Sequence, residues 1–461
     1  MTDLAAPGPA ASPNPAELVK SRDYVAMLVL AAAVGVPVST VAYFYLKAVS
    51  SAQTYFFTTL PEDLGWSKEP AWWPLLPLFV SGLLVAICIR FLPGTSGHKP
   101  AEGFKTSGTV RPVDLYGIVL ASLATLALGA VLGPEAPLIA IGSGLGGLAV
   151  RLLKRGAPPR AVAAIAAAGA FAAIATLLGS PIVGAFLIME TAGLGGPMLG
   201  VVLVPGLLAA GVGALMFVGL DDWTGYGTFS LSIPDAPAFK TPTGYELLWA
   251  LAIGLGAALV GAVIRRLALA LQPRIERRMI TLTPLAGLAV AGCAIAFGES
   301  TTHSSSEVLF SGQAALPALV HDAASWTAGA LLLVVLFKSL AYAISLSCFR
   351  GGPVFPSLYI GAAGGMALSH LPGLPMVAGA AMGIGAMAVA MLGLPMTSVL
   401  LPALLFPSDA LALTPLVIVA VVVSYVIIAR IGPAATSDPA TSDPATPDPA
   451  TPDPAAGERP G

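Results

Sequence analysis

The sequence predicts an all-α protein that crosses the membrane many times on tilted and broken helices. Hydrophobic residues make up 56% of the 461 residues and charged residues only 10%, whereas a soluble domain has about 25% charged residues. The apolar stretches are long and continuous, which excludes a transmembrane β-barrel with its short alternating strands. Glycine and proline cut many of these stretches, and interrupted backbone at membrane depth is tolerated only inside protein or beside a cavity. We therefore expect a multi-pass protein of the cell membrane, in contact with lipid.

Polar tails enclose the predicted membrane domain. Residues 1–22 are rich in alanine and proline, and residues 433–461 repeat Pro, Asp, Ala and Thr. Neither tail can bury a core, so we expect both to be disordered. The domain between them, residues 23–432, divides into halves at about 23–220 and 243–432. Several of its apolar segments are shorter than the roughly 20 residues of an upright span. The segments lie near 24–59, 72–92, 113–133, 136–153, 161–179, 181–220, 243–272, 282–297, 325–347, 357–369, 374–393, 395–406 and 411–430.

Other residue types exclude several classes of function. Cys88, Cys293 and Cys348 stand far apart in or beside apolar segments, which predicts neither a disulfide framework nor a metal site. The net charge of −2 gives no indication of nucleic-acid binding. An intramembrane enzyme would need a nucleophile with a base, or paired acids. The isolated acids Glu135 and Glu190 lie on separate segments with no histidine nearby, so we expect no catalytic residues.

The clearest pattern is an internal repeat around interrupted helices. GPEAPLIAIGSGLG at 133–146 matches GPVFPSLYIGAAGG at 352–365 with a constant offset of 219 residues, and LGSP at 178–181 is followed in the second half by LGLP at 392–395. Chance similarity between glycine-rich helices is the alternative, but the shared order of the motifs favours a true repeat. Repeated Gly/Pro-interrupted segments are the best sequence pointer to a transporter binding site.

Each repeated motif predicts a helix that begins inside the membrane. Proline is tolerated in a first helical turn because its missing N–H would have no partner there. The remaining N–H groups and the positive dipole end attract anions. Glu135 is the only charged residue between Leu115 and Val150, and a carboxylate at membrane depth is costly. We expect it to occupy the anion site and gate it; the alternative is a glutamate that merely stabilises a helix end.

These motifs resemble those of the chloride channel (CLC) family of anion channels and proton-coupled anion exchangers, over about residues 24–432. TSGHKPAEG at 95–103 corresponds to the family's first signature, GPEAP at 133–137 to its gating-glutamate motif and GPVFP at 352–356 to its third motif. The resemblance implies a homodimer with one chloride path per subunit and chloride, rather than a cofactor, as the ligand. It assigns anion binding to a set of five residues: Ser96, Glu135, Ala136, Val354 and Phe355.

The sequence departs from the family pattern at several of these positions. His98 and Lys99 replace an isoleucine and a proline; they would attract anions at a pore mouth or belong to a solvated loop. Pro134 and Pro353 remove two backbone N–H groups beside the site. The tyrosine that the family supplies after its last membrane helix is absent from residues 430–437. Tyr425 lies within the last helix and does not take over that role.

The inner acidic position decides between two mechanisms. Exchangers of the family usually have two adjacent acids at the end of SPIVGAFLIMET, residues 180–191, where this chain has Glu190 and Thr191. A threonine cannot relay protons as a carboxylate does, so we expect a passive voltage- or pH-gated chloride channel, with Glu190 and Thr191 as the possible proton path. The alternatives are a proton-coupled chloride antiporter and an unrelated solute carrier.

Overall fold

The computed structural model describes residues 19–432, apart from 68, 105–108, 155, 194–198, 226–230, 234–235 and 240–241. Most of the first predicted tail and all of the second lie outside the described residues, so their disorder stays a prediction. Described secondary structure is helical except for one isolated β-bridge. The helices are α2 (Arg22–Thr54), α3 (Leu60–Asp63), α4 (Leu75–Phe91), α5 (Leu115–Ala127), α6 (Glu135–Leu153), α7 (Pro159–Leu178), α8 (Pro181–Thr191), α9 (Leu199–Thr224), α10 (Gly244–Arg277), α11 (Met279–Ser300), α12 (Ala315–His321), α13 (Ala328–Cys348), α14 (Val354–Leu368), α15 (Met376–Leu392), α16 (Pro395–Leu405) and α17 (Ala410–Ile431).

The predicted mixture of full and shortened helices is confirmed. Among the described residues, eight helical segments are long and apolar enough to cross a membrane, whereas α4, α5, α8, α14, α15 and α16 are shorter. The apolar segment at 181–220 contains two helices, because α8 ends at Thr191 and α9 begins only at Leu199. Gly193 adopts φ +60° just after α8, a left-handed conformation that glycine accepts readily and that ends helices.

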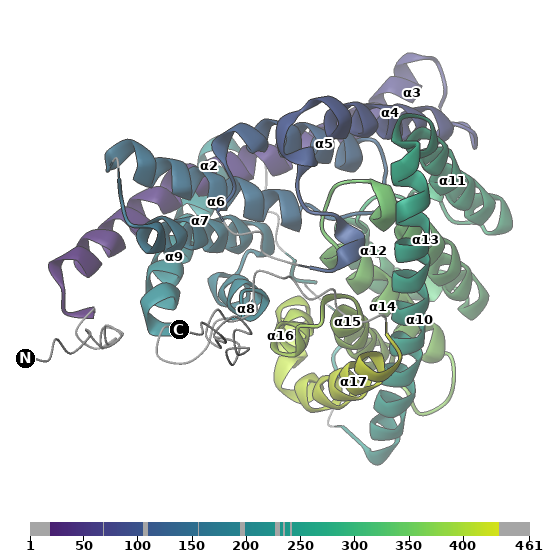
Figure 1. The fold of residues 1–461 in the computed structure, drawn as a ribbon. Coiled ribbons are helices and arrows are strands. Elements are labelled where there is room, and N and C mark those ends of the chain that lie inside the picture. The colour runs from purple at the N-terminus through teal and green to yellow at the C-terminus, as the bar shows by residue number, and fades with distance from the viewer. Residues whose placement is uncertain are drawn as a thin grey trace, which may run out of the picture.

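Most of the first half and most of the second half lie on opposite sides of the molecule, but α4 of the first half packs against α11 of the second (Figure 1). The first half gathers α6, α7 and α9 around α2. In the second half α13, α15 and α17 contact α10, and α14 packs against α13 and α15. The short helices α8 and α16, one from each half, contact each other between the two groups. The helices that begin at the repeated motifs, α6 and α14, therefore start where the halves face each other.

Glycine lets the paired helices approach at backbone distance in both halves. A Cβ added to Gly142 of α6 would lie 2.4 Å from the carbonyl oxygen of Gly169 in α7. In the second half, a Cβ on Gly361 of α14 would lie 2.3 Å from the carbonyl oxygen of Gly383 in α15. Small residues at such contacts are the usual means of packing membrane helices tightly. The repeat found in the sequence is thus also a repeat of packing, which fixes both broken helices rigidly.

Candidate functional site

The two interrupted helices meet through an antiparallel bridge. The Gly133 N–H donates to the Gly352 carbonyl at 2.7 Å, and the Gly352 N–H donates to the Gly133 carbonyl at 2.6 Å. One residue further on, Pro134 and Pro353 are the N-cap residues of α6 and α14. The predicted convergence of residues 133–137 and 352–356 is therefore confirmed, and two positive helix ends lie side by side.

Glu135 is the first residue of α6, but its carboxylate stabilises the other helix. Its side chain is fully buried, and Oε1 accepts a hydrogen bond from the Phe355 N–H at 2.9 Å. The second oxygen, Oε2, has no hydrogen-bond partner among the described residues. A Cβ on Gly352 would lie 1.9 Å from this oxygen, so only glycine leaves room for the carboxylate. The acid thus occupies a helix N-terminus that would otherwise be open to an anion.

Ser96 lies in a loop with an unusual backbone conformation. Gly94, Thr95, Ser96 and Gly97 all have positive φ, between +50° and +90°. Non-glycine residues in this region cost about 1–2 kcal/mol each, and such strain concentrates at functional sites. The Ser96 side chain is 1% exposed, and its hydroxyl has no hydrogen-bond partner among the described residues. The loop therefore holds a buried hydroxyl in place without giving it a protein partner.

That hydroxyl lines a cavity of about 30 Å³. Ala136 of the first turn of α6 lines the same cavity, as do Ser122 of α5 and Arg350. Val354 and Phe355 do not line it. The five residues expected to bind an anion therefore divide between two neighbouring places: Ser96 and Ala136 at the cavity, and Val354 and Phe355 at the helix end that Glu135 occupies.

No tyrosine follows the last described helix, but one from the first half lies close to the cavity. The Tyr45 hydroxyl on α2 donates to the Ser122 hydroxyl at 2.8 Å, and Ser122 lines the cavity. Tyr425, by contrast, is 42% exposed on α17. No pattern in the sequence indicated the contact between Tyr45 and Ser122, because the two residues are 77 positions apart.

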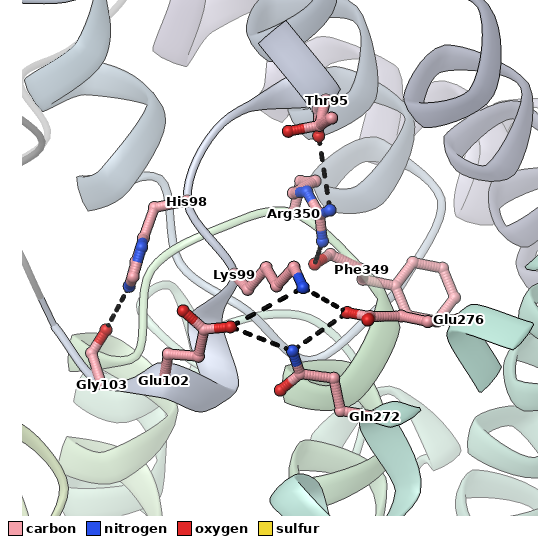
Figure 2. A network of polar contacts seen from close by, with 9 residues as sticks. All are labelled: Thr95, His98, Lys99, Glu102, Gly103, Gln272, Glu276, Phe349 and Arg350. Carbon is pink, nitrogen blue, oxygen red and sulfur yellow. Dashed lines mark hydrogen bonds and ion pairs between the residues drawn. The ribbon is translucent and has the colours of Figure 1, made fainter. Parts of the chain in front are cut away.

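Lys99 joins the loop of Ser96 to the end of α10, and His98 bonds within the loop region itself (Figure 2). The His98 ring is hydrogen-bonded to the Gly103 carbonyl at 2.9 Å. The Lys99 ammonium lies 2.8 Å from Glu276 and 3.7 Å from Glu102. Gln272 donates to both of these carboxylates, at 3.0 and 3.2 Å. The Lys99 charge is therefore paired, while His98 lines the cavity beside Ser96; whether the two residues attract anions or belong to a solvated loop stays a prediction.

Sequence reasoning missed Arg350, which lies between α13 and α14. It is the only charged residue between Lys338 and Asp409, the same signal of isolation that drew attention to Glu135. Its side chain is 6% exposed and lines the cavity beside Ser96. The guanidinium donates to the carbonyls of Phe349 at 3.2 Å and Thr95 at 3.4 Å. A buried cation therefore lies where the resemblance led us to expect only dipoles.

Glu190 stabilises a second helix end across the two halves. Its carboxylate accepts hydrogen bonds from the backbone N–H groups of Met396 and Thr397, both at 2.9 Å, and from the Thr397 hydroxyl at 2.7 Å. These groups belong to the first turn of α16. The Thr191 hydroxyl donates to the Leu187 carbonyl within its own helix. Neither Glu190 nor Thr191 lines the cavity of Ser96, so their part in a proton path stays a prediction.

Replacing Glu190 with glutamine should weaken the contact between α8 and α16. An anion at a helix N-terminus contributes about 0.3–1 kcal/mol, and up to about 2 kcal/mol when partly buried. We expect Glu190→Gln to lower the free energy of unfolding by about 1 kcal/mol, measured by thermal unfolding in detergent. Glu299→Gln, on the exposed end of α11, is the matched control and should change little. Equal stability of the two variants would show that the α16 contact contributes nothing.

Comparison with known proteins agrees with this geometry. The family model described as voltage gated chloride channel matches residues 101–429. A putative ion-transport protein, YfeO, of Escherichia fergusonii is 28% identical over 366 residues, covering 77% of this chain and 82% of that protein. A slow cyanobacterial Cl⁻/H⁺ antiporter has a similar fold, with TM-score 0.71, 21% identity and coverage of 87% of this chain and 94% of that one. A CLC-type fluoride/proton antiporter gives TM-score 0.66 at 20% identity, covering 88% and 96%. This chain therefore belongs to the voltage-gated chloride channel family, the CLC proteins.

Proposed function

We propose that this protein transports chloride or a similar small anion and that Glu135 closes the path. One observation carries the proposal: the buried Glu135 carboxylate accepts the Phe355 N–H at the beginning of α14. Because a helix N-terminus is a ready site for an anion, the carboxylate occupies the place that a permeating anion would take. The path opens when the carboxylate moves away or is protonated.

Two mechanisms follow from this arrangement, and we favour passive conduction by a voltage- or pH-gated channel. In its favour, Thr191 stands where exchangers of the family usually have a second inner acid, and its hydroxyl is engaged within α8. The second candidate is a proton-coupled antiporter, in which Glu190 would receive the proton on the inner side. Support for it comes from the two antiporters of similar fold.

A reversal-potential measurement separates the two mechanisms. Purified protein in liposomes is exposed to opposed chloride and pH gradients, with protein-free liposomes as the control. We expect the current to reverse at the chloride equilibrium potential whatever the pH gradient, because a channel couples no protons. A reversal potential that shifts with the pH gradient at a fixed stoichiometry would instead establish the antiporter. Absence of any anion-dependent current would contradict anion transport itself.

We further propose that the protein is a homodimer with a separate anion path in each subunit. This assembly rests on membership of the family, and the single chain described contains both helix ends and the cavity. Light scattering of the detergent-solubilised protein should give twice the mass of the chain after subtraction of bound detergent. A monomeric mass in transport-competent preparations would contradict the dimer.

A further inference from the structure

Arg350 is a buried cation that forms no ion pair within 4.0 Å among the described residues. Its guanidinium bonds only to the carbonyls of Phe349 and Thr95, and its Nε has no hydrogen-bond partner among the described residues. Arginine stays protonated in proteins. The burial of a charge is costly unless the charge is paired. The position is thus unfavourable for the empty protein and calls for a negative charge beside it.

The acids that lie near Arg350 are engaged elsewhere. Figure 2 shows Glu102 and Glu276 below the guanidinium, each in contact with Lys99. No carboxylate of the described residues lies within 4.0 Å of the guanidinium nitrogens of Arg350. The ion pairs among the described residues are those of Lys99 with Glu102 and Glu276 and of Arg111 with Asp114. No protein carboxylate therefore contacts the guanidinium as a direct counter-charge, although Glu102 and Glu276 act on it at longer range.

The cavity beside Arg350 has a size and a lining that suit a bound anion. Its volume is about 30 Å³, while a single water requires roughly 10–15 Å³ measured in this way. So small a space suits a small ion such as a halide. Ser96 and Arg350 both line it, and each has a buried polar group without a hydrogen-bond partner among the described residues, the Ser96 hydroxyl and Arg350 Nε. Both are hydrogen-bond donors, and the first turn of α6 adds its positive dipole end at Ala136.

We propose that this cavity binds one halide-sized monovalent anion and that Arg350 supplies the full positive charge that holds it. The Ser96 hydroxyl donates a neutral hydrogen bond to the same ion. The inference deepens the proposed function, on which it rests, by adding to the anion path a charged ligand where helix dipoles alone offer only partial charges. Since conduction requires that an ion leave as well as enter, Arg350 favours tight binding and slow release.

Chloride binding to purified full-length protein tests the role of the charge. Isothermal titration calorimetry with chloride in detergent should give a Kd at least tenfold higher for Arg350→Met than for the unaltered protein. Arg350→Lys should lie between the two, because lysine keeps the charge but not the fork of donors. Arg111→Met is the matched control, since Arg111 is 66% exposed and paired with Asp114, and its Kd should not change. A folded Arg350→Met protein whose Kd stays within twofold of the original would overturn the proposal.

A second measurement uses the unaltered protein and so does not depend on the variants folding. Crystals grown in bromide should show an anomalous peak in the cavity, in contact with Arg350 Nε and the Ser96 hydroxyl. Bromide found solely at the beginning of α14, or solely at surface positions as an adventitious ion only, would overturn the proposal. Anion flux into liposomes tests the proposed function separately. Flux with no bromide in the cavity would contradict the anion site at Arg350 and leave the proposal of anion transport intact. Bromide in the cavity without flux would support the anion site and contradict transport.

Discussion

Anion flux through liposomes should rise about 5–30-fold when Glu135 is replaced by alanine or glutamine. The carboxylate competes with the anion for the Phe355 N–H, and a hydrogen bond to a charged group contributes about 1.5–3 kcal/mol. Its removal frees the helix end for the anion. If about 1–2 kcal/mol of this competition is relieved, the flux rises by a factor of about 5–30. Flux of the unaltered protein should increase as the pH falls, because protonation removes the competing charge. Both variants should lose most of this pH response.

Glu246→Gln is the matched control for this measurement. Glu246 also stabilises a helix N-terminus, in a capping box with Thr243 at the beginning of α10, but it lies outside the cavity lining. Its replacement should leave anion flux and its pH response unchanged. If flux and pH response stay the same in Glu135→Ala and Glu135→Gln as well, Glu135 has no part in the mechanism.

Gly352→Ala should strongly disturb the site, and Glu135→Ala should largely restore it. The added Cβ would lie 1.9 Å from Glu135 Oε2 and 2.9 Å from its Cδ. Overpacking of this kind costs about 1–3 kcal/mol. In the double variant the carboxylate is gone, and the nearest remaining contact is the Ala136 nitrogen at 3.0 Å. A double-mutant cycle on the free energy of unfolding should therefore give a coupling of about 0.5–3 kcal/mol.

Gly364→Ala is the control for this cycle. It lies in α14, the helix that begins just after Gly352, but its added Cβ would meet only Val335 at 3.9 Å, an ordinary contact. Its stability should be unchanged or slightly increased, as for other Gly→Ala changes that introduce no strain. Equal destabilisation by Gly352→Ala with and without the Glu135 carboxylate would mean that the backbone, rather than the acid, requires the glycine.

The fold class and the two helix N-termini could be predicted because both depend on local signals, and the repeat of the motif led to the prediction that the two ends converge. A Gly-Pro pair ahead of an apolar run marks a helix N-terminus wherever it occurs, so residues 133–137 and 352–356 could be recognised individually. The helix end that the acid occupies could not be predicted, since Glu135 and Phe355 are 220 residues apart in the chain. The separation of Ser96 from Phe355 into neighbouring places depends on the same long-range packing.

Arg350 is a different case, because a local signal was present. An isolated charge in a long apolar region is expensive, and that argument led from the sequence to Glu135. Applied equally to residues 339–408, it leads to Arg350. What no pattern in the sequence contains is the lack of a carboxylate in contact with Arg350, because Lys99 engages Glu102 and Glu276.

The bridge between Gly133 and Gly352 also bears on how such a chain can arise from a duplicated ancestor. At the offset of 219 residues, Glu135 corresponds to Val354 and Arg350 to Val131, and both valines are fully buried. A pair of identical halves would carry two acids here or none, and two acids so close could not both ionise. In the fused chain the two copies have diverged to one acid and one cation. The symmetry of a duplicated ancestor is thus lost at these two positions, beside the bridge that still joins its halves.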